Sequence, residues 1–276
     1  MANSKASTRK ASESSASGVQ ELDWYRTPHY YDIIFDEDTE READFLEDAR
    51  ERYALSRGRR VLEPACGSGR LVKAMAERGY RVTGTDRSPE MLAYADERVR
   101  AAGLKARLVQ ANMQDPAPKG PYDLAHCLVS TFKYLLRETD ARAHLQSVAD
   151  ALAPGGIYCL GFHLSKYDGS LSDEESWKQT RAGVQVECSI DSSAPNRKAR
   201  TEEVTCRLRV REGRRRLETV THWKFRTYNA AQFRSLLAKV PELELVATHD
   251  FLYEIEECMP FDDALFDALL ILRKRR

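Results

Sequence analysis

Between residues 59 and 164 the chain alternates short apolar runs with amphipathic stretches. The runs rich in strand-forming residues predict five strands, at 60–64, 80–85, 108–110, 123–130 and 157–163. Helical patterns lie between them, from about 70 to 77, from Ser88 onward and from about 139 to 152. Ser88-Pro89 is typical of a helix start, because serine caps free amides and proline fits the first turn. This alternation predicts a doubly wound α/β fold, a parallel sheet with helices on both faces.

The period of the pattern changes after Ser165. Apolar and polar residues alternate within 182–228, as at Val184, Val186 and Cys188, which predicts antiparallel strands inserted into the α/β domain. A helix from Asn229 and two strands close the chain. The predicted helix and strands span about 229–240, 243–248 and 265–273.

The N-terminal segment has a different character. Residues 1–18 are mostly Ser, Ala and charged residues, a composition that does not offset ordering entropy. A helix with an apolar stripe is predicted at about 39–55. The expected organisation is therefore a disordered tail at 1–20, a helical lid at 21–58, an α/β core at 59–164, an antiparallel β insert at 165–228, and a C-terminal helix with the last two core strands at 229–276.

Composition narrows the class of protein. The 276 residues carry 43 basic and 43 acidic side chains, and zero net charge argues against a polyanion as the main partner. The six cysteines form no C-x-x-C pair, so neither a structural zinc site nor any other metal is expected. No apolar run approaches the roughly 20 residues that span a membrane. Residues 1–20 have no apolar signal core, so we expect a cytoplasmic protein with free thiols.

The strongest chemical signal is a strand that ends in Glu63 and runs through a Gly67-Ser68-Gly69 turn into a helix. Glycines accept positive φ and let backbone amides approach a ligand closely. The helix N-terminus favours an anionic group. Asp86 ends the next strand, where an acid accepts hydrogen bonds from both hydroxyls of a ribose. Together these residues predict a nucleoside site.

Two kinds of nucleoside protein compete at this point. A nicotinamide dehydrogenase normally has a third glycine three residues after the second, where this chain has Val72. Three further features argue against a dehydrogenase and favour a protein that binds a different nucleoside cofactor. They are Glu63 before the turn, Asn112-Met113 after the third strand, and Pro-Gly-Gly at 154–156.

With these motifs the chain resembles the class I S-adenosylmethionine-dependent methyltransferases of the small-molecule type. The resemblance covers roughly residues 25–164 and the last two strands. It implies a seven-stranded, mostly parallel Rossmann-like sheet whose last strand is antiparallel. It also implies S-adenosylmethionine as methyl donor and S-adenosylhomocysteine as product.

The resemblance assigns roles by position. Gly67 and Gly69 would let the backbone pass under the cofactor, Glu63 would hold its ammonium, and Asp86 would bind its ribose. Family members often carry Asp where Asn112 stands, but an Asn oxygen still accepts from the adenine amino group. The implied cofactor-binding residues are Tyr25, Glu63, Ala65, Cys66, Gly67, Gly69, Asp86, Arg87, Met91, Asn112, Met113 and Leu128.

For Cys66, Met91 and Met113 an ordinary structural role is the alternative to cofactor binding. Cys66 reads best as a small side chain in a tight turn and not as a nucleophile. Met91 and Met113 flank or face the adenine in the family reading, and core packing is the alternative.

Acceptor-side candidates follow the fourth and fifth strands. Phe132, Tyr134 and His163 are the predicted substrate residues, with Ser130 nearby. The catalytic residue is left unassigned, because methyl transfer works through alignment and water exclusion and a neutral amine needs no base. Its candidates are His163, whose alternative is a capping role, and Tyr31.

The surroundings of that site carry two further expectations. The N-terminal aromatics form either a lid or core packing. They are Trp24, Tyr25, Tyr30 and Tyr31. His222, within the insert, is expected to be structural.

Three classes of function stay open. A small-molecule methyltransferase is favoured, with nitrogen over oxygen as the accepting atom. Basic clusters at 211–216 and 273–276 keep an RNA or protein methyltransferase as an alternative, although nucleic acid is not the expected partner. A non-catalytic cofactor-binding subunit is the third class. The insert also resembles one that roofs an active site or builds a homodimer.

Overall fold

The computed structural model describes residues 19–167 and 173–276, so most of the predicted tail lies outside the described residues. The strand β1 (Gln20–Glu21) already pairs in parallel with β10 (Arg215–Arg226). The last residue of the predicted tail therefore belongs to a sheet.

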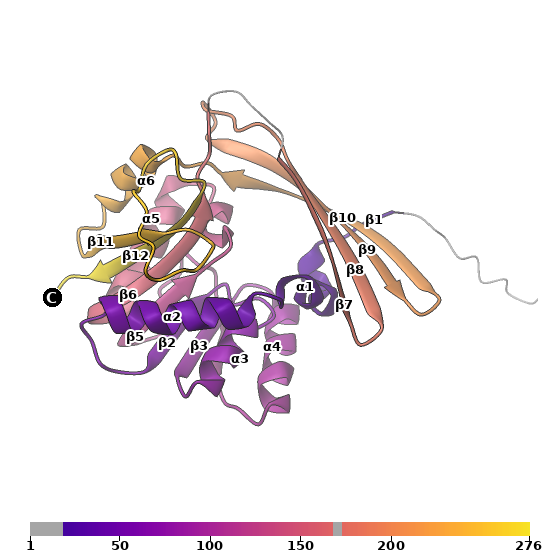
Figure 1. The fold of residues 1–276 in the computed structure, drawn as a ribbon, viewed down its shortest axis with the longest axis horizontal. Coiled ribbons are helices and arrows are strands. Elements are labelled where there is room, and N and C mark those ends of the chain that lie inside the picture. The colour runs from indigo at the N-terminus through magenta and orange to yellow at the C-terminus, as the bar shows by residue number, and fades with distance from the viewer. Residues whose placement is uncertain (1–18, 168–172) are drawn as a thin grey trace, which may run out of the picture.

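The core is a seven-stranded sheet with the order β11-β12-β6-β5-β2-β3-β4 (Figure 1). Its strand β12 runs antiparallel to both β6 and β11, and the other pairs are parallel. The predicted fold class is confirmed. The strands are β2 (Arg60–Pro64), β3 (Arg81–Asp86), β4 (Arg107–Gln110), β5 (Tyr122–Cys127), β6 (Leu152–His163), β11 (Leu243–His249) and β12 (Asp267–Lys274).

Successive residues of the central strands point to opposite faces, and both faces are buried. Leu124 and Ile157 belong to one apolar cluster, and Ala125 and Tyr158 belong to the other. Burial on both sides is what a parallel sheet covered by two helical layers requires. The layers are α2 (Thr39–Tyr53), α3 (Arg70–Glu77) and α4 (Pro89–Ala101) on one face, and α5 (Glu138–Ala151) and α6 (Ala230–Leu237) on the other.

Two strand boundaries differ clearly from the prediction: β5 ends at Cys127, three residues before the predicted end at Ser130, and β6 starts early. The strand β6 begins at Leu152, five residues before the predicted start at Ile157. Leu152 already pairs with Tyr122, and a register shift then carries the chain through the Pro-Gly-Gly segment. The sequence therefore indicates a turn where the structure has an irregular strand.

The insert is a second sheet, with the order β1-β10-β9-β8-β7. Its strand β7 was not predicted, because its sequence DEESWKQTR lacks apolar alternation. The inner face packs on Ile33 and Ile34 of α1 (Pro28–Phe35). Figure 1 shows the insert extending away from the core with α1 under one end. The other insert strands are β8 (Val184–Ser192) and β9 (Thr201–Glu212).

The segment predicted as a lid divides into two parts. The short helix η1 (Trp24–Arg26) and α1 lie against the insert, whereas α2 packs on α3 and on the core sheet. Among the described residues, no helix is long and apolar enough to cross a membrane. A cytoplasmic location and a homodimer through the insert stay predictions.

Candidate active site

The turn between β2 and α3 is a strained loop. Ala65, Gly67 and Gly69 have φ values of 55°, 53° and 73°. A β-carbon on Gly67 would lie 3.8 Å from the Tyr31 ring, in ordinary contact. A β-carbon on Gly69 would lie 2.6 Å from that of Ala95 on α4, which is too close. Gly69 thus serves helix packing, and Gly67 keeps the open side of the loop clear.

Asp86 fixes this loop from the neighbouring strand. One carboxylate oxygen accepts the Gly67 amide at 2.9 Å, and the other accepts the Ser88 amide at 2.8 Å. Burial raises the pKa of Asp86, and the two amide hydrogen bonds oppose that rise. A cavity of about 200 Å³ opens here, and we call it the Asp86 cavity. Its wall includes Tyr25, Tyr31, Ala65, Gly67, Arg87, Asn112, Met113 and Tyr134.

The side chain of Asn112 lines this cavity and is held by Asp115. Its amide nitrogen donates to Asp115 at 3.0 Å, and its backbone amide donates to the same oxygen at 2.9 Å. The side-chain oxygen of Asn112 is left as the hydrogen-bond acceptor, as the sequence argument requires.

A smaller hollow of about 50 Å³ lies on the other side of the loop, and we call it the Glu63 hollow. Cys66 and Leu128 line it together with Glu63. One Glu63 oxygen is buried with no hydrogen-bond partner among the described residues, and its distance to the His126 Nε2 atom is 3.9 Å. Burial raises the pKa of Glu63 to about 8, and burial lowers that of His126 to about 3. The hollow therefore presents an unsatisfied carboxyl oxygen beside a neutral imidazole.

A third and larger cavity, of about 470 Å³, lies between the core and the inner face of the insert. We call it the insert cavity. Tyr31 and Thr131 line all three spaces, so the spaces meet at these two residues. The aromatic part of its wall comprises Trp24, Tyr25, Tyr31, Phe35, Tyr134, Trp177, Trp223, Phe225 and Phe266.

Three tyrosines stand near this meeting point. The Tyr25 hydroxyl donates to the Tyr134 hydroxyl at 2.8 Å. Burial raises the pKa of Tyr25, Tyr31 and Tyr134 well above the usual value. All three phenols are therefore neutral at physiological pH, and two of them, Tyr25 and Tyr134, are hydrogen-bonded to each other.

His163 lines the insert cavity with a defined orientation. Its Nδ1 lies 2.7 Å from a carboxylate oxygen of Asp267, and its ring stacks on Phe266. Because a carboxylate only accepts, Nδ1 carries the proton and Nε2 is the acceptor in the neutral ring. Asp267 was missed in the sequence, since it is 104 residues from His163 and has no local motif.

A buried ion pair in the same cavity was also missed. Lys133 is 3% exposed, and its ammonium lies 2.6 Å from Glu202 on β9. A lysine in a short polar-apolar run looks like a surface residue. In the structure its ammonium contacts two residues of the insert, Glu202 of β9 and the Phe225 ring of β10.

Some residues that were predicted to lie in the site do not line the cavities. Phe132 is fully buried against Phe162 and Tyr228, so it packs in the core and does not face an acceptor. Met91 is fully buried at the start of α4, which agrees with the core-packing alternative. His222 is exposed and contacts Thr205. Among the described residues, no group of three His, Cys, Asp or Glu side chains could hold a metal ion.

Comparison with known sequences gives the class of this domain. Residues 61–156 match the family described as methyltransferase domain. A glycine/sarcosine N-methyltransferase of Halorhodospira halochloris is 34% identical over 142 residues, which are 50% of this chain and 51% of that protein. A ubiquinone biosynthesis O-methyltransferase of Cronobacter sakazakii is 34% identical over 101 residues, 36% of this chain and 40% of that protein. The chain spans about half or less of the curated relatives it matches.

Comparison with solved structures extends the likeness to nearly the whole fold. A methyltransferase from Clostridium acetobutylicum superposes with a TM-score of 0.73 at 19% identity, over 92% of this chain and 99% of that one. The amino pentose methyltransferase CalS10 from Micromonospora echinaspora gives 0.67 at 18%, over 93% and 100%.

The fold is that of solved S-adenosylmethionine-dependent methyltransferases, and residues 61–156 match a methyltransferase domain, as the sequence motifs predict.

Proposed function

We propose that this protein transfers a methyl group from S-adenosylmethionine to a small-molecule acceptor, at nitrogen in preference to oxygen. The observation that carries the proposal is the meeting of three spaces at Tyr31 and Thr131. A donor in the two loop-side spaces and an acceptor in the insert cavity would then have their reacting atoms at one junction.

The residues around the loop fit the donor. Asp86 offers a buried carboxylate for the ribose hydroxyls, and the Asn112 oxygen can accept from the adenine amino group. The unpartnered Glu63 oxygen suits an ammonium, which would ionise this carboxyl on binding. A β-carbon at Gly67 would add a group on the open side of the loop.

The bound donor supplies an electrophilic methyl group on a sulfonium. The chain's own residues would align the acceptor and exclude water, which removes much of the barrier to an in-line displacement. Tyr31 and the Tyr25–Tyr134 pair form a neutral, aromatic wall at the junction. His163 Nε2, oriented by Asp267, would take the proton from a cationic amine or a hydroxyl.

The insert cavity supports a small acceptor. Its volume of about 470 Å³ lies within the range of small-molecule sites, which are mostly apolar with a few placed polar groups. The named relatives include both N- and O-methyltransferases, and an amino pentose methyltransferase shares the fold. An amine carried on a polar small molecule is the acceptor we favour.

Calorimetric titration with S-adenosylhomocysteine, followed by methyl-transfer assays on amine and hydroxyl acceptors, tests the proposal. We expect micromolar binding and turnover of an amine. Folded protein that does not bind the nucleoside would overturn the proposal. Strongly salt-dependent RNA binding with RNA methylation would support the alternative instead.

A further inference from the structure

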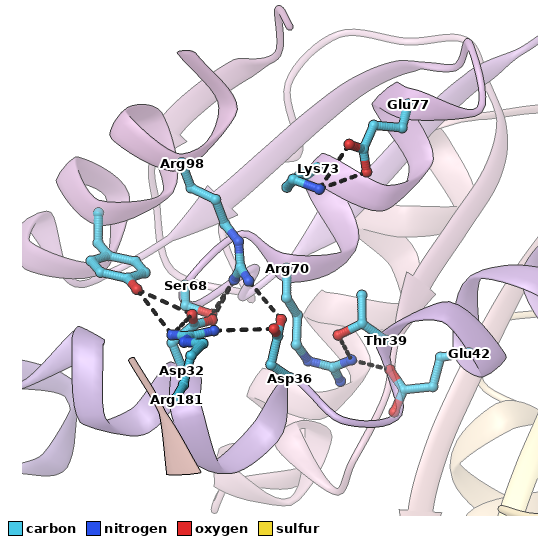
Figure 2. Close-up of polar contacts among 11 residues, drawn as sticks. Asp32, Asp36, Thr39, Glu42, Ser68, Arg70, Lys73, Glu77, Arg98 and Arg181 are labelled. Carbon is cyan, nitrogen blue, oxygen red and sulfur yellow. Dashed lines mark hydrogen bonds and ion pairs between the residues drawn. The ribbon is translucent and has the colours of Figure 1, made fainter. Parts of the chain in front are cut away.

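A network of charges around one buried carboxylate connects the glycine loop, α1 and the insert (Figure 2). Its centre is Asp32 of α1, which is 1% exposed. The Asp32 carboxylate accepts hydrogen bonds from the hydroxyls of Ser68 at 2.7 Å and Tyr94 at 3.1 Å. It also accepts from Arg181 at 2.5 Å and from Arg98. Four groups from three separate parts of the chain thus share one carboxylate.

Each arginine in the network bridges the same two aspartates. Arg98 donates to Asp32 and, at 2.5 Å, to Asp36. Arg181 donates to Asp32 and, at 3.1 Å, to Asp36. Burial would raise the pKa of Asp32, but Arg98, Ser68 and Arg181 hold it below its usual range. The carboxylate is therefore charged, and two cations balance two anions.

The members of the network lie next to functional positions. Ser68 follows Gly67 in the glycine loop, and Tyr31, which lines all three spaces, precedes Asp32 on α1. Arg181 ends β7, the strand whose Trp177 lines the insert cavity and donates to the Ile34 carbonyl at 3.2 Å. The helix α1 is thus tied to the loop on one side and to the insert on the other.

A gain in folding stability does not by itself explain why the chain has such a network. Removing charges from water costs about as much as their mutual attraction returns, so buried ion pairs add little net stability. Each guanidinium here donates to two carboxylates through separate nitrogens, and its rigid, directional geometry fixes the relative position of the groups that it bridges.

We propose that Asp32 is a positioning residue that couples nucleoside binding at the glycine loop to closure of the insert over the acceptor. A ligand that orders the loop holds Ser68 and hence Asp32. Asp32 in turn sets α1 with Tyr31 and, through Arg181, the β7–β8 hairpin. The inference rests on the proposed function, because it requires a nucleoside at the loop.

Hydrogen–deuterium exchange with and without S-adenosylhomocysteine tests this coupling. In the wild type we expect the ligand to slow exchange several-fold in α1 and in the hairpin (173–192), although no hairpin residue lines the Asp86 cavity or the Glu63 hollow. In Arg181→Met the ligand should still protect α1, and the ligand-dependent slowing in the hairpin should fall below twofold. In Asp32→Asn protection of both segments should be lost, and the Kd should rise about tenfold.

A matched control is the exposed Lys73–Glu77 pair on α3, drawn in the same view (Figure 2). Glu77→Gln should leave protection of both segments unchanged. A merely structural role of Arg181 would change hairpin exchange equally with and without ligand, and this outcome would overturn the coupling. The coupling would also be overturned if exchange in the wild-type hairpin were the same with and without bound ligand. Failure of folded wild type to bind would instead overturn the proposed function, and the coupling with it.

Discussion

The carboxylate of Asp86 accepts the backbone N–H of Gly67 at 2.9 Å and so joins the end of β3 to the glycine loop after β2. The two residues are 19 positions apart in the chain. The same carboxylate accepts the Ser88 amide, which fixes the start of α4. The acid proposed to hold the ribose therefore also shapes the loop proposed to pass beneath the cofactor.

Replacing Asp86 tests this double role. Asp86→Ala should weaken S-adenosylhomocysteine binding about 100-fold, since hydrogen bonds to a charged group contribute about 1.5–3 kcal/mol each. Calorimetry measures the Kd. Asp96→Ala removes a half-exposed acid on α4 that pairs with Arg100; this variant is the control and should bind normally. Equal affinity in the two variants would exclude Asp86 from the site.

The two glycines of the loop should respond differently to a methyl group. Gly69→Ala should lower the free energy of unfolding by about 2–3 kcal/mol, because the new β-carbon meets Ala95 at 2.6 Å and φ is positive. Gly67→Ala should cost only about 1 kcal/mol of strain, because its surroundings are open, and should mainly weaken ligand binding. Urea unfolding and calorimetry separate the two effects, and the reverse ranking would contradict the packing.

Glu63 should make stability depend on pH. The pKa of Glu63 is about 8 in the folded protein and 4.5 in the unfolded chain. Between these two pH values the folded protein holds a proton on Glu63 that the unfolded chain has lost. The stabilisation of the folded state by this proton is full below about pH 4.5 and is lost as the pH rises through 8. Over this range the folding constant falls by up to about tenfold per pH unit. Urea unfolding at pH 5, 7 and 9 should show the wild type losing stability relative to Glu63→Gln. Parallel pH curves would show that Glu63 is ionised throughout.

His163 should matter for turnover and not for nucleoside binding. His163→Gln removes the nitrogen that Asp267 orients and should lower kcat for methyl transfer about 100-fold, the scale of general base catalysis. Its S-adenosylhomocysteine Kd should match that of the wild type. His222→Gln, on the outer part of the insert, serves as the comparison and should retain full activity. Full activity of His163→Gln would mean that the acceptor reacts as a neutral amine without a base.

Most helices and strands of the α/β core could be predicted from local sequence patterns. Strand periodicity, the Ser88-Pro89 helix start and the glycine turn each depend on neighbouring residues, and the structure has the elements they predict. The same signals fail for β7, where cross-strand pairing with β8 holds a polar sequence in a sheet. They also fail for the start of β6, which its pairing with Tyr122 decides.

Local sequence patterns also fail to predict the position of some single residues within the site. The pattern identifies Gly67 and Gly69 as a motif, but only the approach of Ala95 shows that one serves packing. Phe132 and Tyr134 stand two positions apart after β5, yet the first is in the core and the second lines two cavities. The turn of η2 (Thr131–Tyr134) sets which side chain faces inward.

The sequence by itself determined the α/β architecture, the glycine loop and the acid opposite it, because these depend on residues close together in the chain. Tertiary structure alone decided which distant groups meet. Asp32 and Arg181 are 149 residues apart, and His163 and Asp267 are 104 apart. No local pattern encodes such pairs, because the packing of the insert and the last strand against the core brings them together.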